Sequence, residues 1–204
     1  MSAESISQDR TPTGAWTAPV VLVLASGRGE RFKASGAQVH KLQALLGGRP
    51  VLERTLDAVR ASGLPWHVEA AGHPGMGDSI AAAVRATAQA PGWLVLPADL
   101  PLVRPDTLVQ VAQALVQGRG SVVMPLYQGE RGHPVGFAAA CRDGLLALRG
   151  EGGAASVLRQ QAVEQRWSLT LDDPGVVTDI DTLEDLARAE ALGQRLGYWG
   201  AGSA

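Results

Sequence analysis

The residues best suited to chemistry in this sequence are cations that crowd a loop of small residues. The loop, residues 25–29, reads ASGRG, and its small side chains let backbone N–H groups approach a ligand closely. The cations in and after it are Arg28, Arg31, Lys33 and Lys41. Because amides and cations together neutralise an anion, the segment is a candidate phosphate cradle.

The loop matches neither common glycine-rich phosphate motif. It lacks the G-x-x-x-x-G-K-[ST] spacing of a P-loop, and Gly27-Arg28-Gly29 lacks the third glycine of a dinucleotide fingerprint. A surface turn with solvated charges is the alternative, and a lone G-x-G would favour it. The four crowded cations favour the phosphate interpretation instead.

A second candidate for chemistry is Asp99, which follows the apolar run of residues 93–96. If that run is a buried parallel strand, Asp99 lies at the edge where open α/β sheets bind ligands. A carboxylate there suits Mg²⁺, which proteins bind through one or two carboxylates plus substrate phosphates. The structural alternative is an aspartate in a turn before proline.

The elements that must position these residues alternate between strand and helix patterns. Residues 20–24, VVLVL, form an apolar run that predicts a strand buried on both faces. Further strands are predicted at residues 66–70, 93–96, 121–126 and 167–171, and helices at 51–62, 80–89, 105–117, 144–148, 154–161 and 183–192. This alternation predicts a single three-layer α/β/α domain with a mostly parallel, Rossmann-like sheet.

Helix caps and chain ends complete this prediction. Asp78 is expected to cap the helix of residues 80–89, and Asp181 or Thr182 the last helix. We expect residues 1–18 to form a poorly ordered tail, residues 19–192 the domain, and residues 193–204 a C-terminal tail.

The composition is that of an ordinary globular enzyme. The chain has 204 residues, of which 46% are hydrophobic and 19% charged, enough for one full core. A net charge of −2 gives no reason to expect nucleic acid or an anionic membrane as a partner. Cys141 is the only cysteine, which excludes an internal disulfide and a cysteine-rich metal site. Without a membrane-length apolar run or a signal-peptide layout, the expectation is a soluble cytoplasmic protein.

The opening segment resembles a known family. LASGRGERF…HKL is similar to the L-A-[AG]-G-x-x-x-R-[MF]-G…K-L opening of the nucleotidyltransferases that build molybdenum cofactor dinucleotides. In that family the loop wraps a nucleoside triphosphate, whose phosphates are held by the arginine and the lysine. The resemblance gives nucleotide-binding roles to Leu24, Ala25, Ser26, Gly27, Arg28, Gly29, Arg31 and Lys41.

Two details of this segment refine the resemblance. Ser26-Gly27 is closer to the Ala-Gly of the cytidylyl-transferring branch than to the two glycines of the guanylyl-transferring branch. The spacing from Arg31 to Lys41 is longer than usual in the family, which implies an insertion. Lys33 or Arg28 is therefore an alternative to Lys41 as the phosphate ligand.

A glycine-rich turn continues the resemblance. GMGDSI resembles the family's G-M-[GS]-x-S-[LI] turn, which lies against the base and ribose. It implies binding roles for Gly75, Met76, Gly77 and Ser79, and His73 in the same turn is a further candidate. A plain capped turn is the alternative.

Three later motifs follow in the family's order. RGHPVGF resembles a segment that faces the pterin substrate, so His133 is a candidate for a phosphate or pterin contact, against a purely structural role. ADLPL and DIDTLED resemble the two metal arms of the family, which implies that Asp99 and Asp181 bind Mg²⁺. Helix capping by Asp181-Thr182 is the alternative at the second arm.

The resemblance implies a specific reaction. The protein would transfer CMP from CTP to molybdenum-bearing molybdopterin and release pyrophosphate, with Arg31, Lys41, Asp99 and Asp181 as catalytic residues. A molybdenum hydroxylase apoenzyme is an implied partner. Two alternatives stay open: the same fold acting on a sugar phosphate or other small acceptor, and a non-catalytic cofactor-binding maturation protein.

The sequence also departs from the family. An additional strand and crossover usually separate the first long helix from the glycine-rich turn, whereas here only residues 63–72 do so. Either the sheet has lost a strand and its helix, or the remaining strand takes the vacated place. Near residue 151 the family's G-D-x-G-A-[RK] is replaced by a stretch with Glu151 and Ala155, which removes the expected cation.

Overall fold

The protein, described by a computed structural model over residues 16–199, has one seven-stranded sheet at its centre. Its strands lie in the order β4 (Trp66–Glu69), β1 (Val20–Leu24), β5 (Gly92–Pro97), β8 (Val135–Ala138), β6 (Val122–Tyr127) and β7 (Glu130–Arg131), and β9 (Arg166–Thr170) also pairs with β6. β4, β1, β5, β6 and β9 run in one direction, and β8 and β7 in the other. The predicted α/β fold with a mostly parallel sheet is confirmed.

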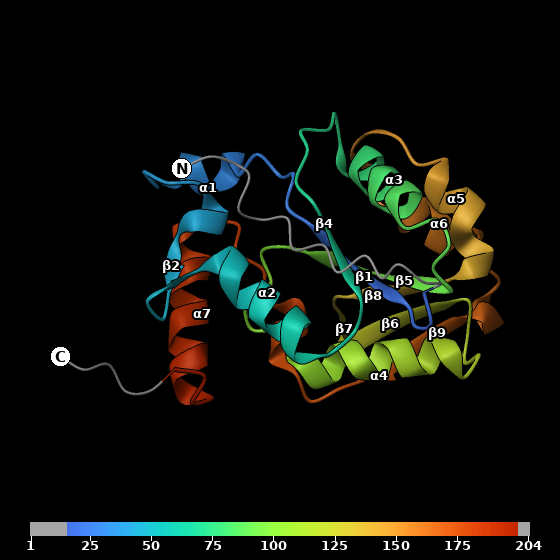
Figure 1. The fold of residues 1–204 in the computed structure, drawn as a ribbon. Helices are drawn as coiled ribbons and strands as arrows, with labels where there is room; N and C mark the ends of the chain where they lie inside the picture. The colour runs from blue at the N-terminus through green and yellow to red at the C-terminus, as the bar shows by residue number, and fades with distance from the viewer. Residues whose placement is uncertain (1–15, 200–204) are drawn as a thin grey trace.

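Helices cover both faces of this sheet, as predicted (Figure 1). One face carries α2 (Val51–Ala61), α4 (Pro105–Val116) and α7 (Leu183–Arg195), and the other carries α3 (Met76–Ala86), α5 (Arg142–Leu146) and α6 (Ala155–Gln160). Each face of the sheet carries a hydrophobic core: the first lies under α2, α4 and α7, and the second under α3, α5 and α6. β1 contributes to both, because Val21 and Val23 belong to the first core and Val20, Leu22 and Leu24 to the second. Its complete burial explains the unbroken apolar run.

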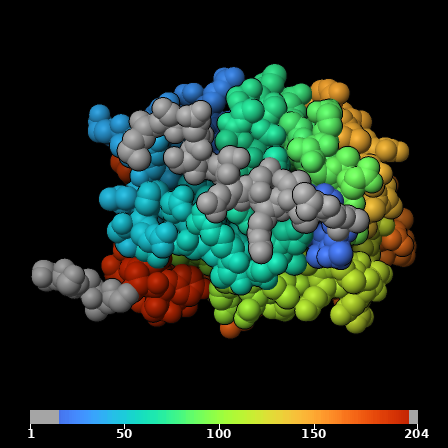
Figure 2. All heavy atoms as spheres, viewed as in Figure 1, coloured from blue at the N-terminus to red at the C-terminus, as the bar shows by residue number. Residues whose placement is uncertain are grey.

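Shorter elements connect these layers. They are α1 (Glu30–Ala34), the β2 (Leu45–Leu46) and β3 (Arg49–Pro50) hairpin, and single 3₁₀ turns at Lys41–Gln43, Ala139–Cys141, Gly150–Gly152, Val163–Gln165 and Pro174–Val177. The segment that carries the hairpin lies against α7 at one end of the molecule (Figure 2).

Of the two expected helix caps, one is confirmed and one is wrong. Thr182 caps α7 by accepting the Asp185 N–H, as predicted. The expected cap at Asp78 is wrong: α3 begins at Met76 with Gly75 as its N-cap. Asp78 lies inside the first turn, where its carboxylate accepts the Gly150 N–H at 2.8 Å. That side chain ties the segment around Gly150 to α3 instead of capping the helix.

The short connection before the glycine-rich turn leaves the sheet without an extra strand at that edge. β4 pairs directly with β1 in parallel, with Leu24 opposite Glu69. The remaining strand therefore occupies the place beside β1, which was one of the two expected alternatives.

The last helix extends further along the chain than predicted. α7 extends to Arg195, so the predicted boundary at residue 192 falls inside this helix. Trp199 packs against the first core, and the Arg54 guanidinium lies 4.6 Å from the centre of its ring. Of the predicted N-terminal tail, residues 1–15 lie outside the described range, and Trp16 packs against the second core.

Candidate active site

Two carboxylates and a lysine meet at the carboxyl edge of the sheet. Lys41 Nζ lies 2.5 Å from Asp99 Oδ2 and 2.9 Å from Asp181 Oδ1. An Arg31 guanidinium nitrogen lies 2.5 Å from Asp181 Oδ2. Four of the predicted site residues thus form one ion-pair network, although they are separated by as many as 150 positions in the chain.

The chain brings these residues together through backbone contacts. Asp99 stands just beyond β5, and its carbonyl accepts the Ile180 N–H at 3.1 Å, which sets the segment carrying Asp181 beside it. The same segment is anchored by Asp173, a fully buried carboxylate that accepts hydrogen bonds from Thr107 Oγ1 at 2.6 Å and the Gly175 N–H at 2.9 Å. Sequence reasoning missed Asp173, since nothing local marks its distant partners.

The centre is shielded from water. Only 13% of the Lys41 side chain, 13% of Asp99 and 22% of Asp181 is exposed. Burial opposes the charged form of Lys41, but attraction to Asp99 and Asp181 outweighs it and raises the lysine pKa. The pKa of nearby Asp179 is also raised, by burial and by the charges of the neighbouring aspartates.

The carboxylates of this centre fit a divalent cation. Asp99 Oδ1 is buried and accepts no hydrogen bond from the described residues, so it can take a further positive partner. Within residues 16–199 no cluster of three or more His, Cys, Asp or Glu side chains has the geometry of a metal site. Two carboxylates completed by substrate phosphates and water are a usual coordination of Mg²⁺.

The cation-lined loop borders a cavity of about 370 Å³. The predicted residues that line it are Ser26, Gly27, Arg28, Gly29, Arg31, Lys41, Gly75, Met76, Ser79 and Asp181, and His73 and Glu151 line it as well. Leu24, Ala25 and Gly77 do not line it. Lys33 does not line it either and is exposed on α1, so of the alternatives considered for the phosphate it is the least favoured by the geometry.

The insertion between Arg31 and Lys41 is fixed to the loop by His40. His40 Nδ1 accepts the Leu42 N–H at 3.3 Å, which leaves Nε2 to donate to the Gly27 carbonyl at 2.9 Å. His40 therefore braces the loop and delivers Lys41 to the carboxylates. Sequence reasoning missed this role, and its only available signal was the position of His40 directly before Lys41.

The glycine-rich turn has a packing reason for its glycines. A Cβ on Gly75 would lie 2.3 Å from the Gly150 carbonyl carbon, and one on Gly77 would lie 2.9 Å from the Arg149 carbonyl oxygen. The start of α3 therefore needs small residues to pack against residues 149–151. Ser79 Oγ lies 2.6 Å from Ser26 Oγ, which joins the turn to the cation-lined loop.

Two further cavities adjoin the cation-lined one, and Met76 lines all three. One, of about 360 Å³, is polar, and its lining includes Asp99, Asp179, Asp181 and Arg131. The other, of about 340 Å³, is mainly apolar, lined by side chains that include Leu24, Ile80, Val95, Met124, Phe137 and Leu158. Met76, Pro97 and His133 line both, so the two spaces adjoin.

His133 stands where these two cavities meet. Its Nδ1 is buried without a hydrogen-bond partner among the described residues. Burial lowers the pKa of His133, and its hydrogen bond to the Val95 backbone and the charges of Asp99 and Asp179 only partly oppose that effect. His133 does not line the cation-lined cavity; it lines both the polar and the apolar cavity.

The sheet order and the ligand-sized cavities at its carboxyl edge define an α/β nucleotidyltransferase fold. The structure of Rv0371c from Mycobacterium tuberculosis H37Rv is similar over 86% of this chain and 99% of that chain, with a TM-score of 0.72 and 22% identity. That protein has also been solved as a manganese complex, with a TM-score of 0.69 and 21% identity. Molybdopterin-guanine dinucleotide biosynthesis protein A from Archaeoglobus fulgidus gives a TM-score of 0.63 and 19% identity, over 86% of this chain and 99% of that one.

Sequence comparison identifies the family. Residues 57–165, just over half of the chain, match the model of the MobA-like NTP transferase domain. The chain belongs to this family and is a nucleotidyltransferase. It is also 30% identical over 154 residues to the bifunctional protein GlmU of Alkalilimnicola ehrlichii. That match covers 64% of this chain but 31% of GlmU, so the chain spans about a third of that relative.

No helix in residues 16–199 is long and apolar enough to cross a membrane.

Proposed function

We propose that the protein transfers CMP from CTP to molybdenum-bearing molybdopterin and releases pyrophosphate, with Mg²⁺ as its cofactor. The observation that carries the proposal is the meeting of Asp99, Asp181 and Lys41 between a cation-lined cavity and a second pair of cavities. Two substrates in adjoining cavities can thus reach one charged centre. A protein that only binds a cofactor does not need this arrangement, which disfavours the non-catalytic alternative.

The chemistry needs alignment and charge neutralisation more than a covalent nucleophile. A terminal phosphate oxygen of the acceptor forms a bond to the α-phosphorus of CTP while the bond from that phosphorus to pyrophosphate breaks. The acceptor phosphate is already ionised near neutral pH, so no general base is required. Arg28, Arg31 and Lys41 neutralise the triphosphate and then the departing pyrophosphate.

A divalent ion has a defined role in this scheme. Asp99 and Asp181 would hold Mg²⁺, which supplies charge neutralisation for the reacting phosphates. The buried Asp99 Oδ1 supports this role, because it lacks a partner in the described residues. The manganese complex of Rv0371c supports a divalent cation in a protein of the same fold.

The preference for CTP rests on the nucleoside end of the cavity. Ser26 carries a side chain where a glycine would leave open space, and its hydroxyl is held 2.6 Å from that of Ser79. Both residues line the cavity, so the added hydroxymethyl group leaves less room for a purine than for a pyrimidine. Ser26→Gly should accordingly reduce the ratio of CTP to GTP that the enzyme uses when both are present.

The acceptor is inferred from the apolar cavity, which adjoins the polar cavity lined by Asp99. Its lining of Met124, Phe137 and other apolar side chains suits a flat heterocycle better than a sugar, whose hydroxyls would lose their hydrogen bonds with water. Arg131 and His133 at its rim can contact the acceptor phosphate or the ring edge. The resemblance of RGHPVGF to a pterin-facing segment points to the same acceptor.

A pyrophosphate-release assay tests the whole proposal. The purified protein is mixed with Mg²⁺, equal CTP and GTP, and either molybdenum-bearing molybdopterin or a set of sugar phosphates, and the product is identified by mass spectrometry. The cytosine dinucleotide should dominate with molybdopterin, and Asp99→Asn should reduce its formation at least about a hundredfold. A guanine product would refute the base assignment, and turnover with sugar phosphates alone would refute the acceptor.

A further inference from the structure

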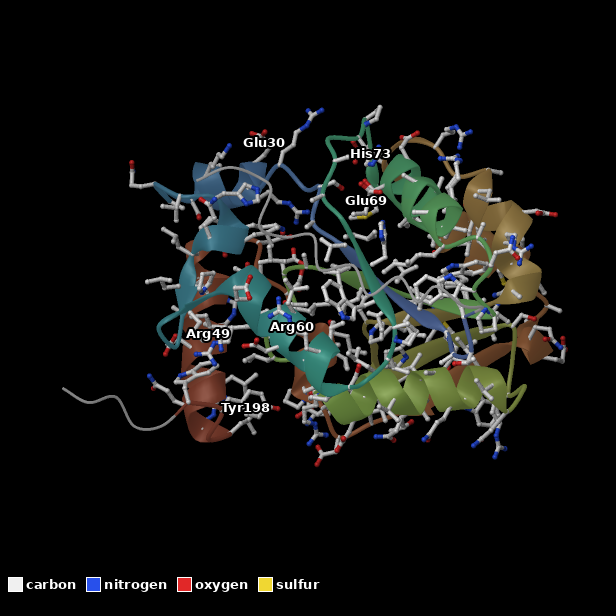
Figure 3. All side chains as sticks on the ribbon, viewed as in Figure 1. Glu30, Arg49, Arg60, Glu69, His73 and Tyr198 are labelled. Carbon is white, nitrogen blue, oxygen red and sulfur yellow. The ribbon has the colours of Figure 1, made fainter. Side chains whose placement is uncertain are left out.

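His73 lines the cation-lined cavity and is paired with Glu69, which lies behind it and does not line the cavity. His73 Nε2 lies 3.1 Å from Glu69 Oε1, and the two side chains are 20% and 12% exposed. Figure 3 shows them pointing toward each other between the end of β4 and the start of α3. His73 also lines the cavity, together with Gly75 and Ser79.

The Glu69 carboxylate faces one ring nitrogen of His73 at ion-pair distance. Glu69 Oε1 accepts the Ala71 N–H at 3.0 Å and lies beside His73 Nε2. His73 Nε2 makes no hydrogen bond to a described residue, so the Glu69 carboxylate acts on it through its negative charge, which favours the proton on the nitrogen that faces it. In the neutral imidazole the other nitrogen, Nδ1, is then an acceptor.

The position of the pair determines which end of a nucleotide it meets. The Glu69 carbonyl accepts the Ala25 N–H at 2.8 Å, which fixes the pair to the beginning of the small-residue loop. The phosphate ligands Arg31 and Lys41 lie with Asp181 instead. His73 lines the same cavity as Ser26 and Ser79, the two residues to which the proposed function assigns the nucleoside end.

We propose that His73, held by Glu69, selects the nucleoside by accepting a hydrogen bond at Nδ1 from a donor on the nucleotide. This inference rests on the proposed function, since it places the nucleoside of the triphosphate in the same cavity. The donor is the ribose 2′-hydroxyl or the exocyclic amine of cytosine. His73 is thus a substrate-binding residue, and Glu69 is a positioning residue that acts through it.

Calorimetric titration with Mg²⁺ and three nucleotides, in the absence of an acceptor, tests the inference. CTP carries both candidate donors, UTP lacks the amine, and dCTP lacks the 2′-hydroxyl. His73→Ala should weaken CTP binding about tenfold, the usual cost of one lost hydrogen bond. An equal loss for CTP and dCTP with none for UTP identifies the amine as the donor, and an equal loss for CTP and UTP with none for dCTP identifies the hydroxyl.

Two variants separate recognition from packing. His73→Asn keeps an acceptor oxygen and should recover part of the affinity, whereas Glu69→Gln should weaken binding about threefold by releasing the imidazole orientation. His67→Ala is the matched control, because His67 also approaches Glu69, at 3.9 Å, but does not line the cavity. In turnover, His73→Ala should raise KM for CTP with kcat nearly unchanged.

Two outcomes overturn the inference while leaving the proposed function intact. One is unchanged CTP affinity in His73→Ala. The other is a uniform loss for all three nucleotides that His67→Ala reproduces. If the wild-type protein bound no nucleotide at all, the proposed function would fail and this inference with it.

Discussion

Replacing Lys41 with alanine should destabilise the protein and make its stability depend on a divalent cation. The Lys41 ammonium lies within 2.9 Å of both Asp99 and Asp181, and all three side chains are mostly buried. Without it, two carboxylates face each other in a site with little water. Removing one partner of a buried ion pair typically costs 3–5 kcal/mol.

The expected size of the effect follows from the partial exposure of the site. Because Asp181 keeps 22% of its side chain exposed and Arg31 still contacts it, we expect the lower end of that range, about 3 kcal/mol. For a chain of this length, about 1 kcal/mol corresponds to roughly 2–4 °C in Tm. Lys41→Ala should therefore melt about 6–12 °C below the wild type in metal-free buffer.

Thermal denaturation with and without Mn²⁺ measures both parts of this prediction. Metal at a free concentration one hundred times its Kd should add about 2.7 kcal/mol to the free energy of unfolding of the variant, because the two carboxylates become available to bind it. The wild type should gain less, since the metal must first displace Lys41. Lys33→Ala is the control, as Lys33 is exposed on α1. An unchanged Tm for Lys41→Ala in metal-free buffer would refute the reasoning.

Three further predictions concern other parts of the site and the fold. Asp181→Asn should lose pyrophosphate release at least about a hundredfold while its circular dichroism spectrum stays unchanged. Since burial lowers the pKa of His133 below 6.5, its contribution to stability is present above pH 6.5 and is lost as the pH falls. His133→Gln should therefore show a flatter decline in unfolding free energy between pH 7 and 5 than the wild type. Gly193→Ala should cost about 1–3 kcal/mol in chemical denaturation, because its Cβ would lie 1.9 Å from the Trp199 ring.

The fold was predictable because its signals are local. The apolar run of β1 and the helical spacing of α4, with Pro105 in its first turn, each report burial within a few residues. The predicted cap at Asp78 failed because its carboxylate bonds to Gly150, 72 positions away, and no local pattern reports such a contact.

The candidate site was predictable in its residue types but not in its connections. The residue types and the family resemblance pointed to Lys41, Asp99 and Asp181, and the structure brings these three side chains together. The brace at His40 and the anchor at Asp173 are set by long-range contacts, so the sequence left them unmarked. Gly77, which the resemblance assigns to the nucleotide, does not line the cavity, and a Cβ there would meet Arg149, a contact that no local pattern reports.

The reversed direction of β8 explains how the second cavity adjoins the charged centre. Parallel strands deliver the residues after their carboxyl ends to one edge, as β1 and β5 do for the loop and for Asp99. β8 is antiparallel to β5, with Val135 opposite Val95, so the residues before it reach the same edge. His133 therefore arrives beside Pro97, and its N–H donates to the Val176 carbonyl of the segment that leads to Asp181. One antiparallel strand thus places the apolar cavity and Asp181 around a single centre.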